Sequence, residues 1–318
     1  MRCGGGRPAL SFRWNGRIDR KTFLLRQLLR PGTLLGYETR GKSPAAIETE
    51  GRNKFPIPSG ASCWAELSGK VLVLAGTRHL RQDLMRKRTV LFIQHSDVDR
   101  PGLLGETLGG MGLSMDVIRP DLGQPVPASL EGFGGLALGG GPQGAYEQEK
   151  YPYLSSECAL VRHAESQCKP VLGLCLGAQL MASALGARVQ PGEREVGFFE
   201  VTLDPISQYD PLWRGIPAKF VATHWHGDVF DIPPGGMRLA SSALTRNQLF
   251  RYGHALYGLQ FHLEMTPGLF EEAVARAYGL LIDSGVDADW IWQQGQECLP
   301  VLRETASTVF ARWAEMLL

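Results

Sequence analysis

Short apolar runs alternate with amphipathic segments along the middle of the chain. Continuous apolar runs are typical of strands that are buried on both faces of a sheet. Between them, Leu103, Leu104 and Leu108 are spaced for one face of a helix. The pattern predicts strands at 89–93, 114–118, 135–138 and 171–174, and helices at 101–111, 154–167 and 180–185. This alternation predicts an α/β fold, with a mostly parallel sheet flanked by helices on both faces.

The pattern changes in the last third of the chain. Paired strands are predicted at residues 237–241 and 248–250, and they lead to a strand-like run from Tyr257 to His262. A helical tail is predicted over residues 268–318. Its expected helices span residues 267–284, 287–296 and 300–317. The last of these carries an apolar stripe, which we expect to pack against the domain rather than to bind a partner.

The first 84 residues differ in charge from the rest. They hold 15 Lys and Arg against 6 Asp and Glu, whereas residues 85–318 hold 18 against 26. Only residues 71–75 have the pattern of a strand. We therefore expect residues 1–84 to be a basic extension that is poorly structured or nonfunctional, and residues 85–318 to be the working domain. An organellar transit peptide and a basic arm that binds nucleic acid are the alternatives.

A cysteine between two glycines follows the strand predicted at residues 171–174. Gly173-Leu-Cys175-Leu-Gly177 has the pattern of a nucleophile elbow, a sharp strand-to-helix turn that needs neighbours without a Cβ. The turn would place the sulfur at a helix N-terminus, where the thiolate is favoured. A thiolate attacks carbonyl carbon. The alternative is a structural cysteine that is buried between packing glycines.

A base for this thiol is available 87 residues later. His262 ends a strand-like run, and Glu264 follows two residues on. Side chains at i and i+2 of an extended segment share a face, so Glu264 is placed to orient the imidazole. Cys175, His262 and Glu264 therefore form a candidate catalytic triad of nucleophile, base and orienting acid.

The two motifs together resemble those of the class I, or triad-type, glutamine amidotransferases. The motifs are Gly-Leu-Cys-Leu-Gly-Ala-Gln around Cys175 and Gln-Phe-His-Leu-Glu around His262, and the resemblance covers about residues 88–265. It implies a flavodoxin-like fold and hydrolysis of the side-chain amide of glutamine through a γ-glutamyl thioester, without a cofactor. A glycine turn at residues 139–142 would then supply an oxyanion hole, from the N–H groups of Gly141 (or Gly140) and Leu176. A plain tight turn is the alternative, and no Walker or dinucleotide motif surrounds it.

The resemblance also implies residues that bind the substrate. Gln179 corresponds to a glutamine that contacts the substrate, and Glu195 and Val196 correspond more weakly to a segment beside it. His226 and Asp228 are candidates for the substrate mouth, with a structural turn as an equal alternative. They belong to a His-x-His-x-Asp run that resembles metallo-hydrolase motifs, but the further ligands of those motifs are missing, so no metal is expected.

Three functions fit these residues. A free-standing amidotransferase would act on glutamine or a γ-glutamyl compound, with a synthase or acceptor-domain partner protein to receive the ammonia. A γ-glutamyl peptidase would need no partner, and a regulatory protein on the same fold would need no triad. Six cysteines without a secretory signal indicate reduced thiols in a cytoplasmic protein. No apolar run reaches the ~18 residues of a membrane span, and no nucleic-acid partner is expected.

Overall fold

The computed structural model describes residues 35–38, 62–67, 70–75, 88–283 and 287–318, which belong to two separate units. Within the first unit, strands β1 (Leu35–Glu38), β2 (Ser62–Leu67) and β3 (Lys70–Ala75) form an antiparallel sheet in that order. The strand expected at residues 71–75 is present, and the other two were not predicted. The expectation that the first 84 residues are poorly structured concerns mostly residues outside the described ones, and it stays a prediction.

The second unit is built on a nine-stranded sheet with the order β5-β4-β6-β7-β12-β11-β10-β8-β9. Its first five strands are parallel to one another. They are β4 (Thr89–Ile93), β5 (Ser114–Ile118), β6 (Gly135–Leu138), β7 (Val171–Leu174) and β12 (Leu256–Leu259). The strands predicted from apolar runs are confirmed, and the mixed α/β sheet flanked by helices is confirmed with them. Strand β5 lies at the edge and is largely exposed, which accounts for its mixed composition.

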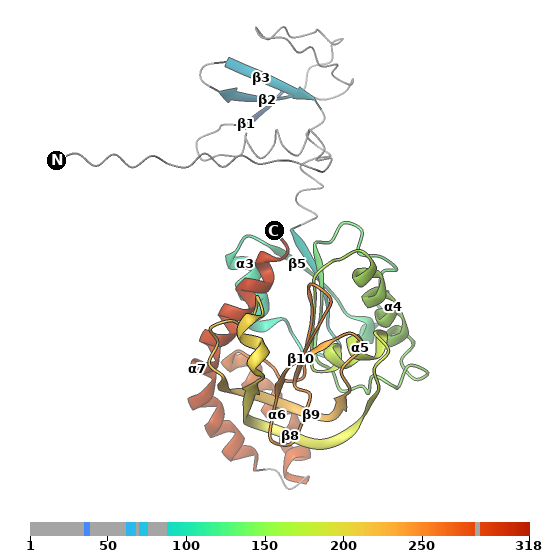
Figure 1. Cartoon of the computed structure of the whole chain (residues 1–318), viewed down its shortest axis with the longest axis vertical. Helices are drawn as coiled ribbons and strands as arrows, with labels where there is room; N and C mark the ends of the chain where they lie inside the picture. Colours follow the sequence, from blue (N-terminus) through green and yellow to red (C-terminus); the bar gives the residue numbers. More distant parts are fainter. Residues whose placement is uncertain (1–34, 39–61, 68–69, 76–87, 284–286) are drawn as a thin grey trace, which may run out of the picture. The chain divides into compact units, whose positions relative to one another are not determined.

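Helices cover both faces of this parallel half because its strands are apolar on both sides. Val90 and Phe92 of β4 point into the core cluster beneath helices α3 (Gly102–Gly110), α6 (Pro267–Asp283) and α7 (Ala288–Glu315). Leu91 and Ile93 point into the opposite cluster, beneath α4 (Pro152–Ser166) and α5 (Leu176–Ala184). Figure 1 shows these two groups of helices on either side of the sheet. Helix α5 begins directly after Cys175, four residues earlier than predicted.

The other half of the sheet is antiparallel. It contains β8 (Val189–Leu203), β9 (Lys219–Phe230), β10 (Met237–Ser241) and β11 (Leu249–Tyr252). Strands β8 and β9 pair over almost their whole length, with one irregularity between Pro191 and Glu195. They were not predicted, because polar residues interrupt their apolar pattern. The turn considered for Thr223–Asp228 is wrong, since this segment is an extended part of β9.

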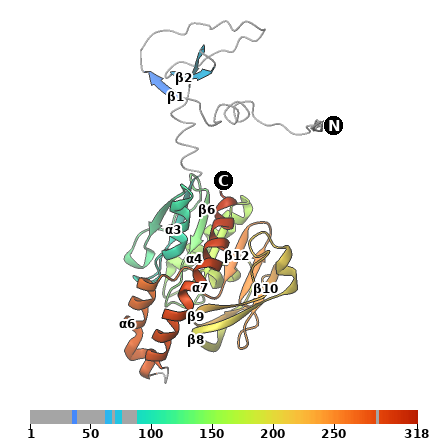
Figure 2. The ribbon, with the colours of Figure 1, turned by 90° about the vertical axis from the view of Figure 1, so that its left-hand side faces the viewer.

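The tail forms two helices rather than three. Helix α7 runs unbroken from Ala288 to Glu315 and contains Pro300, where the sequence predicted a break. Proline removes a backbone donor and normally ends or kinks a helix. Here both halves of α7 are held by burial of Ile291 and Trp313 against the domain, next to α3, β8 and β9 (Figure 2). The expected packing of the apolar stripe is therefore confirmed. Among the described residues, no helix combines the length and apolar character that crossing a membrane requires.

Truncation of the buried stripe should destabilise the whole domain. Trp313 is fully buried, so we expect Trp313→Ala to lower the free energy of unfolding by about 3–5 kcal/mol. Trp290 is the matched control, because it lies on the same helix with 48% of its surface exposed. Trp290→Ala should change the stability by about 0.5 kcal/mol. Urea unfolding followed by circular dichroism measures both, and equal losses would show that the stripe is not part of the domain core.

Candidate active site

Cys175 occupies a sharp turn between strand β7 and helix α5. Its φ of 52° and ψ of −108° are unusual for a residue with a side chain, and such strain costs on the order of 1–3 kcal/mol. A Cβ at Gly173 would lie 2.6 Å from the carbonyl of Gly177, and one at Gly177 would lie 2.3 Å from the carbonyl oxygen of Leu138. The two glycines are therefore needed where strand and helix approach, as the elbow pattern predicts.

The sulfur of Cys175 lies among polar groups. Its Sγ is 3.7 Å from the carbonyl oxygen of Trp225, and Gln260 Nε2 lies 3.7 Å from Sγ. The backbone N–H of Cys175 donates to Leu259 at 2.7 Å, which ties the elbow to the end of β12. Because helix α5 begins at the next residue, the sulfur also lies at a helix N-terminus, where negative charge is favoured.

His262 and Glu264 form a buried hydrogen bond. His262 Nδ1 donates to Glu264 Oε1 at 2.6 Å, and both residues are almost fully buried. Burial disfavours the charged imidazole, but the Glu264 carboxylate and the Cys175 sulfur raise the pKa of His262 well above its usual value. His262 Nε2 is buried and has no partner with hydrogen-bond geometry among the described residues.

Backbone contacts hold this pair in place although both residues lie beyond the end of β12. The N–H of His262 donates to Thr223 of β9 at 2.8 Å, and the carbonyl of Glu264 accepts from Leu103 of α3 at 2.9 Å. The prediction that Glu264 contacts the imidazole of His262 is met, although the segment is not a regular strand.

The glycine turn after β6 faces the start of helix α5. The N–H of Gly177 donates to Gly139 at 3.1 Å, and a Cβ at Gly141 would lie 2.7 Å from Leu176 Cδ2. A Cβ at Gly140 would lie 3.1 Å from His262 Cε1, so the turn also borders the imidazole. Within the described part of the chain, the N–H groups of Gly141 and Leu176 donate to no backbone carbonyl. Of these two residues, Gly141 lines the pocket at Cys175.

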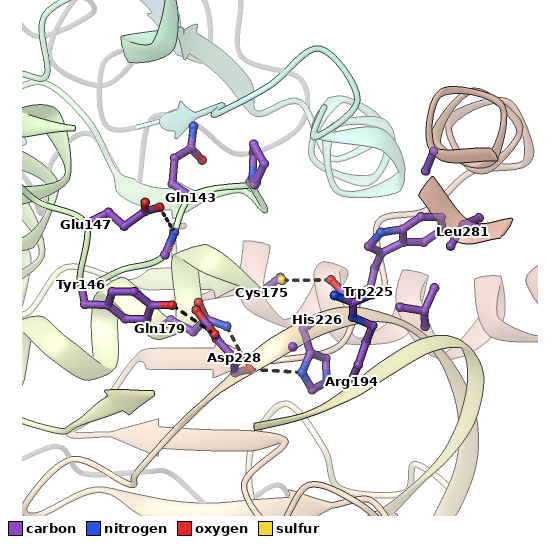
Figure 3. Close-up of a pocket in the computed structure, with 16 residues that line it drawn as sticks. Gln143, Tyr146, Glu147, Cys175, Gln179, Arg194, Trp225, His226, Asp228 and Leu281 are labelled. Atoms are coloured by element: carbon purple, nitrogen blue, oxygen red, sulfur yellow. Dashed lines mark hydrogen bonds between the residues drawn. The ribbon is translucent and has the colours of Figure 1, made fainter. Parts of the chain in front are cut away.

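A pocket of about 450 Å³ opens at Cys175. Figure 3 shows Tyr146, Glu147, Gln179 and Asp228 on one side of the sulfur. Gln179 Nε2 donates to the carbonyl of Asp228 at 3.3 Å, and the Tyr146 hydroxyl donates to Asp228 Oδ1 at 3.5 Å. The structure thus brings two of the predicted substrate residues, Gln179 and Asp228, to one end of the pocket.

The opposite side of the pocket has a different character. Trp225 and Arg194 lie there together with Leu281 of α6 (Figure 3). None of them was a candidate from the sequence, and neither were Tyr146 and Glu147. The sequence pattern around Leu281 indicates only a helix that packs on the core, and no local motif marks the other four residues as part of a pocket. These side chains come together only when the chain folds.

His226 lines the pocket and also belongs to a buried polar cluster behind it. His226 Nε2 lies 3.2 Å from Glu195 Oε2, and His224 Nδ1 lies 3.9 Å from the same oxygen. Ser242 and Gln248 donate to Glu195 at 2.6 and 2.7 Å. Glu195, which the sequence assigned weakly to the substrate, therefore links β8 to the connection between β10 and β11. Val196 does line the pocket.

The three residues Glu195, His224 and His226 could offer ligand atoms to a metal, since these atoms lie within 4.8 Å of one another. The same atoms already have a donor, however. Gln248 Nε2 donates to Glu195 and lies 3.3 Å from His224 Nδ1. An N–H group directed at these acceptors suits a hydrogen-bonded network and opposes a cation, so this arrangement gives no argument for a metal.

The sequence of this chain is similar to those of glutamine amidotransferases and of glutamine-hydrolyzing GMP synthases. The family model "Glutamine amidotransferase class-I" matches residues 103–278. The glutamine amidotransferase-like protein YfeJ of Salmonella typhimurium is 30% identical over 199 residues, which cover 61% of this chain and 83% of that protein. A glutamine-hydrolyzing GMP synthase subunit of Methanospirillum hungatei is 32% identical over 145 residues, 45% of this chain and 70% of that one. The chain spans only 23% of the GMP synthase of Thermomicrobium roseum.

Solved structures agree with the sequence comparison. The crystal structure of a glutamine amidotransferase from Thermotoga maritima superimposes with a TM-score of 0.67 at 30% identity. It covers 71% of this chain and 98% of that chain.

Acid should weaken the domain through the cluster behind the pocket. Burial raises the pKa of Glu195, but hydrogen bonds from His226 and Ser242 outweigh it and lower that pKa to about 2. Burial lowers the pKa of His224 to about 3. Both groups bind protons more readily in the unfolded chain, so their stabilisation is present at neutral pH. The contribution of His224 is lost as the pH falls from about 6.5 through 3, and that of Glu195 as the pH falls from about 4.5 through 2.

Glu195→Gln tests this prediction. The variant should lose on the order of 3 kcal/mol of stability at pH 7, and its stability should depend less on pH between 7 and 4 than that of the wild type. Glu200→Gln is the control, because Glu200 lies on the same strand with an exposed side chain paired to Lys219. Urea unfolding at both pH values gives the comparison, and identical pH dependence in all three proteins would contradict the assignment.

Proposed function

Since the chain belongs to the class I glutamine amidotransferases, we propose that it hydrolyses the side-chain amide of glutamine or a γ-glutamyl compound through a thioester on Cys175. One observation carries this proposal. A cysteine on a strained elbow lies close enough to His262 to raise the pKa of that histidine, and the other ring nitrogen of His262 is hydrogen-bonded to a buried carboxylate at 2.6 Å. This is the arrangement that nucleophile–base–acid catalysis needs, whatever the fold.

The reaction begins at the sulfur. Cys175 gives its proton to His262 Nε2 and attacks the amide carbon, while Glu264 stabilises the imidazolium and fixes the ring. Negative charge develops on the carbonyl oxygen, and the N–H groups of Gly141 and Leu176 would stabilise it as hydrogen-bond donors. His262 then protonates the leaving amine. Water hydrolyses the thioester and restores the thiol, and no step requires a cofactor.

The polar end of the pocket suits the amino-acid end of the substrate. Asp228 offers a carboxylate that can pair with the α-ammonium group, and Tyr146 holds this carboxylate by a hydrogen bond. Gln179 packs against the same segment and can hydrogen-bond the substrate. His226 Nδ1 lies 3.2 Å from the carbonyl oxygen of Asp228 and supports its backbone.

The ammonia has two fates to consider. Relatives of this chain are GMP synthase subunits, whose name implies a partner, so a synthase protein is the first candidate to receive ammonia from this chain. A γ-glutamyl peptidase that acts alone is the second candidate. The size of the pocket favours the peptidase. Its volume of about 450 Å³ lies in the range that holds drug-sized ligands, and the pocket extends past the sulfur to Trp225 and Leu281. A γ-glutamyl dipeptide would use that space, whereas glutamine would not.

Glutamate release from glutamine and from a γ-glutamyl dipeptide, measured in parallel on the purified chain, tests the proposal. Cys175→Ser should lower the rate by at least about 10³-fold, because the weakly acidic hydroxyl is a poor substitute for the thiol. Cys168→Ser is the control, because Cys168 is exposed and lies outside the pocket. Faster cleavage of the dipeptide would favour the peptidase. Hydrolysis that survives Cys175→Ser would exclude the triad. If neither the wild type nor Cys175→Ser hydrolyses a substrate and both retain the same biological role, the chain is a regulatory protein.

Glu264→Gln separates orientation from nucleophilicity. An amide in place of the carboxylate can donate to Nδ1, which moves the proton to Nε2 and leaves no lone pair for the thiol. We expect kcat to fall by about 10²-fold or more with little change in the free energy of unfolding. Single-substrate kinetics measure the loss, and a variant with wild-type kcat would show that Glu264 has no part in catalysis.

A further inference from the structure

A second buried pair of histidine and carboxylate lies behind the glycine turn. His95, which follows β4, and Glu157 of α4 are 1% and 0% exposed. His95 Nε2 lies 2.9 Å from Glu157 Oε2. Burial of such a pair is expensive unless its hydrogen bonds are complete. The mechanism proposed above uses neither residue, so the pair needs another explanation.

The second nitrogen of His95 reaches the glycine turn. His95 Nδ1 lies 2.9 Å from the carbonyl oxygen of Gly140. The Gly140 carbonyl can only accept, so Nδ1 carries a proton; with Glu157 ionised, Nε2 carries the second proton and His95 is an imidazolium. Burial opposes this charge, but Glu157 and the Gly140 carbonyl outweigh it and raise the pKa of His95 above its usual value. The two contacts therefore form one charged chain, from Glu157 through His95 to Gly140.

This chain ends on the peptide group that matters for the oxyanion. The carbonyl of Gly140 and the N–H of Gly141 belong to the same peptide, which is trans and planar. When the carbonyl is directed at His95, the N–H must point the opposite way. Three consecutive glycines, at 139–141, leave this peptide free to rotate unless something holds it. A Cβ at Gly141 would lie 2.7 Å from His95 Cβ, so the close approach depends on glycine.

We propose that His95 and Glu157 are positioning residues for the oxyanion hole, which hold and polarise the Gly140–Gly141 peptide so that its N–H faces the developing negative charge. This inference rests on the proposed function, because it assigns Gly141 as an oxyanion donor. A positive charge at the carbonyl end strengthens the donor at the other end of the same peptide. A preformed donor of this kind stabilises the transition state more than the bound substrate.

The double variant His95→Leu with Glu157→Met is the main test. A single replacement of His95 would leave a buried carboxylate without a partner, whereas two apolar replacements of similar size retain the packing. Loss of one oxyanion donor typically costs about 10²–10³-fold in kcat, and a donor that is present but free to rotate should cost less. We therefore expect kcat for glutamate release to fall by about 10–100-fold, with KM changed by less than about 3-fold.

The rate at which iodoacetamide alkylates Cys175 is the second measurement. A general loss of structure would change this rate, whereas the loss of an oxyanion donor would not. In this reaction the sulfur forms a bond to a saturated carbon and iodide leaves, so no oxyanion develops. Mass spectrometry of the peptide that contains Cys175 gives the rate separately from the other thiols. We expect the double variant to react at the wild-type rate. An equal fall of kcat and alkylation would place the defect at the nucleophile and overturn the proposal.

Glu157→Gln separates orientation from charge. The amide can donate to Nε2 while Nδ1–H stays on Gly140, so the peptide keeps its direction and loses the positive charge behind it. We expect a smaller loss of kcat than in the double variant, and an equal loss would overturn the orienting role. If Cys175→Ser is inactive and the double variant has wild-type kcat, this inference alone fails. If hydrolysis survives Cys175→Ser, the proposed function fails first.

Discussion

The strained turn at Cys175 is the constraint on which the site depends. A cysteine with φ of 52° is stable only where the surrounding structure over-determines it. Here that structure is the close contact of β7 with α5, which requires Gly173 and Gly177, and the hydrogen bond from Cys175 to Leu259 of β12. Strands β6, β7 and β12, which flank the turn, are buried along their whole length. The sulfur therefore stands at the carboxyl ends of the central strands, where ligands bind in such sheets.

Three buried carboxylates of the domain belong to hydrogen-bonded pairs or networks. Glu264 serves His262, Glu157 serves His95, and Glu195 accepts hydrogen bonds from Ser242 and Gln248. Each carboxylate is held by fixed donors, so none of these contacts can be exchanged for water without loss. This arrangement favours a site whose electrostatics are set before the substrate enters, which is the condition for stabilising charge in a transition state.

The antiparallel half and the tail give the pocket its shape. Strand β9 supplies the wall with Trp225, His226 and Asp228, and α6 closes one side with Leu281. The relatives of similar size share the fold that carries the elbow, and the chain spans most of their length.

Local features of the sequence determined the parallel strands and the elbow. Continuous apolar runs specify strands buried on both faces, and glycines around a cysteine specify a tight turn, and neither signal depends on distant contacts. The spacing of His262 and Glu264 suggested their contact, but hydrogen bonds to Thr223 and Leu103, far away in the sequence, hold that segment in place. The tertiary structure decided the rest. Burial of both halves overrode Pro300 in α7, and pairing over many residues made strands of the polar segments β8 and β9. His95 and Glu157 are 62 residues apart, so only the packing of α4 against the sheet could bring them to the glycine turn.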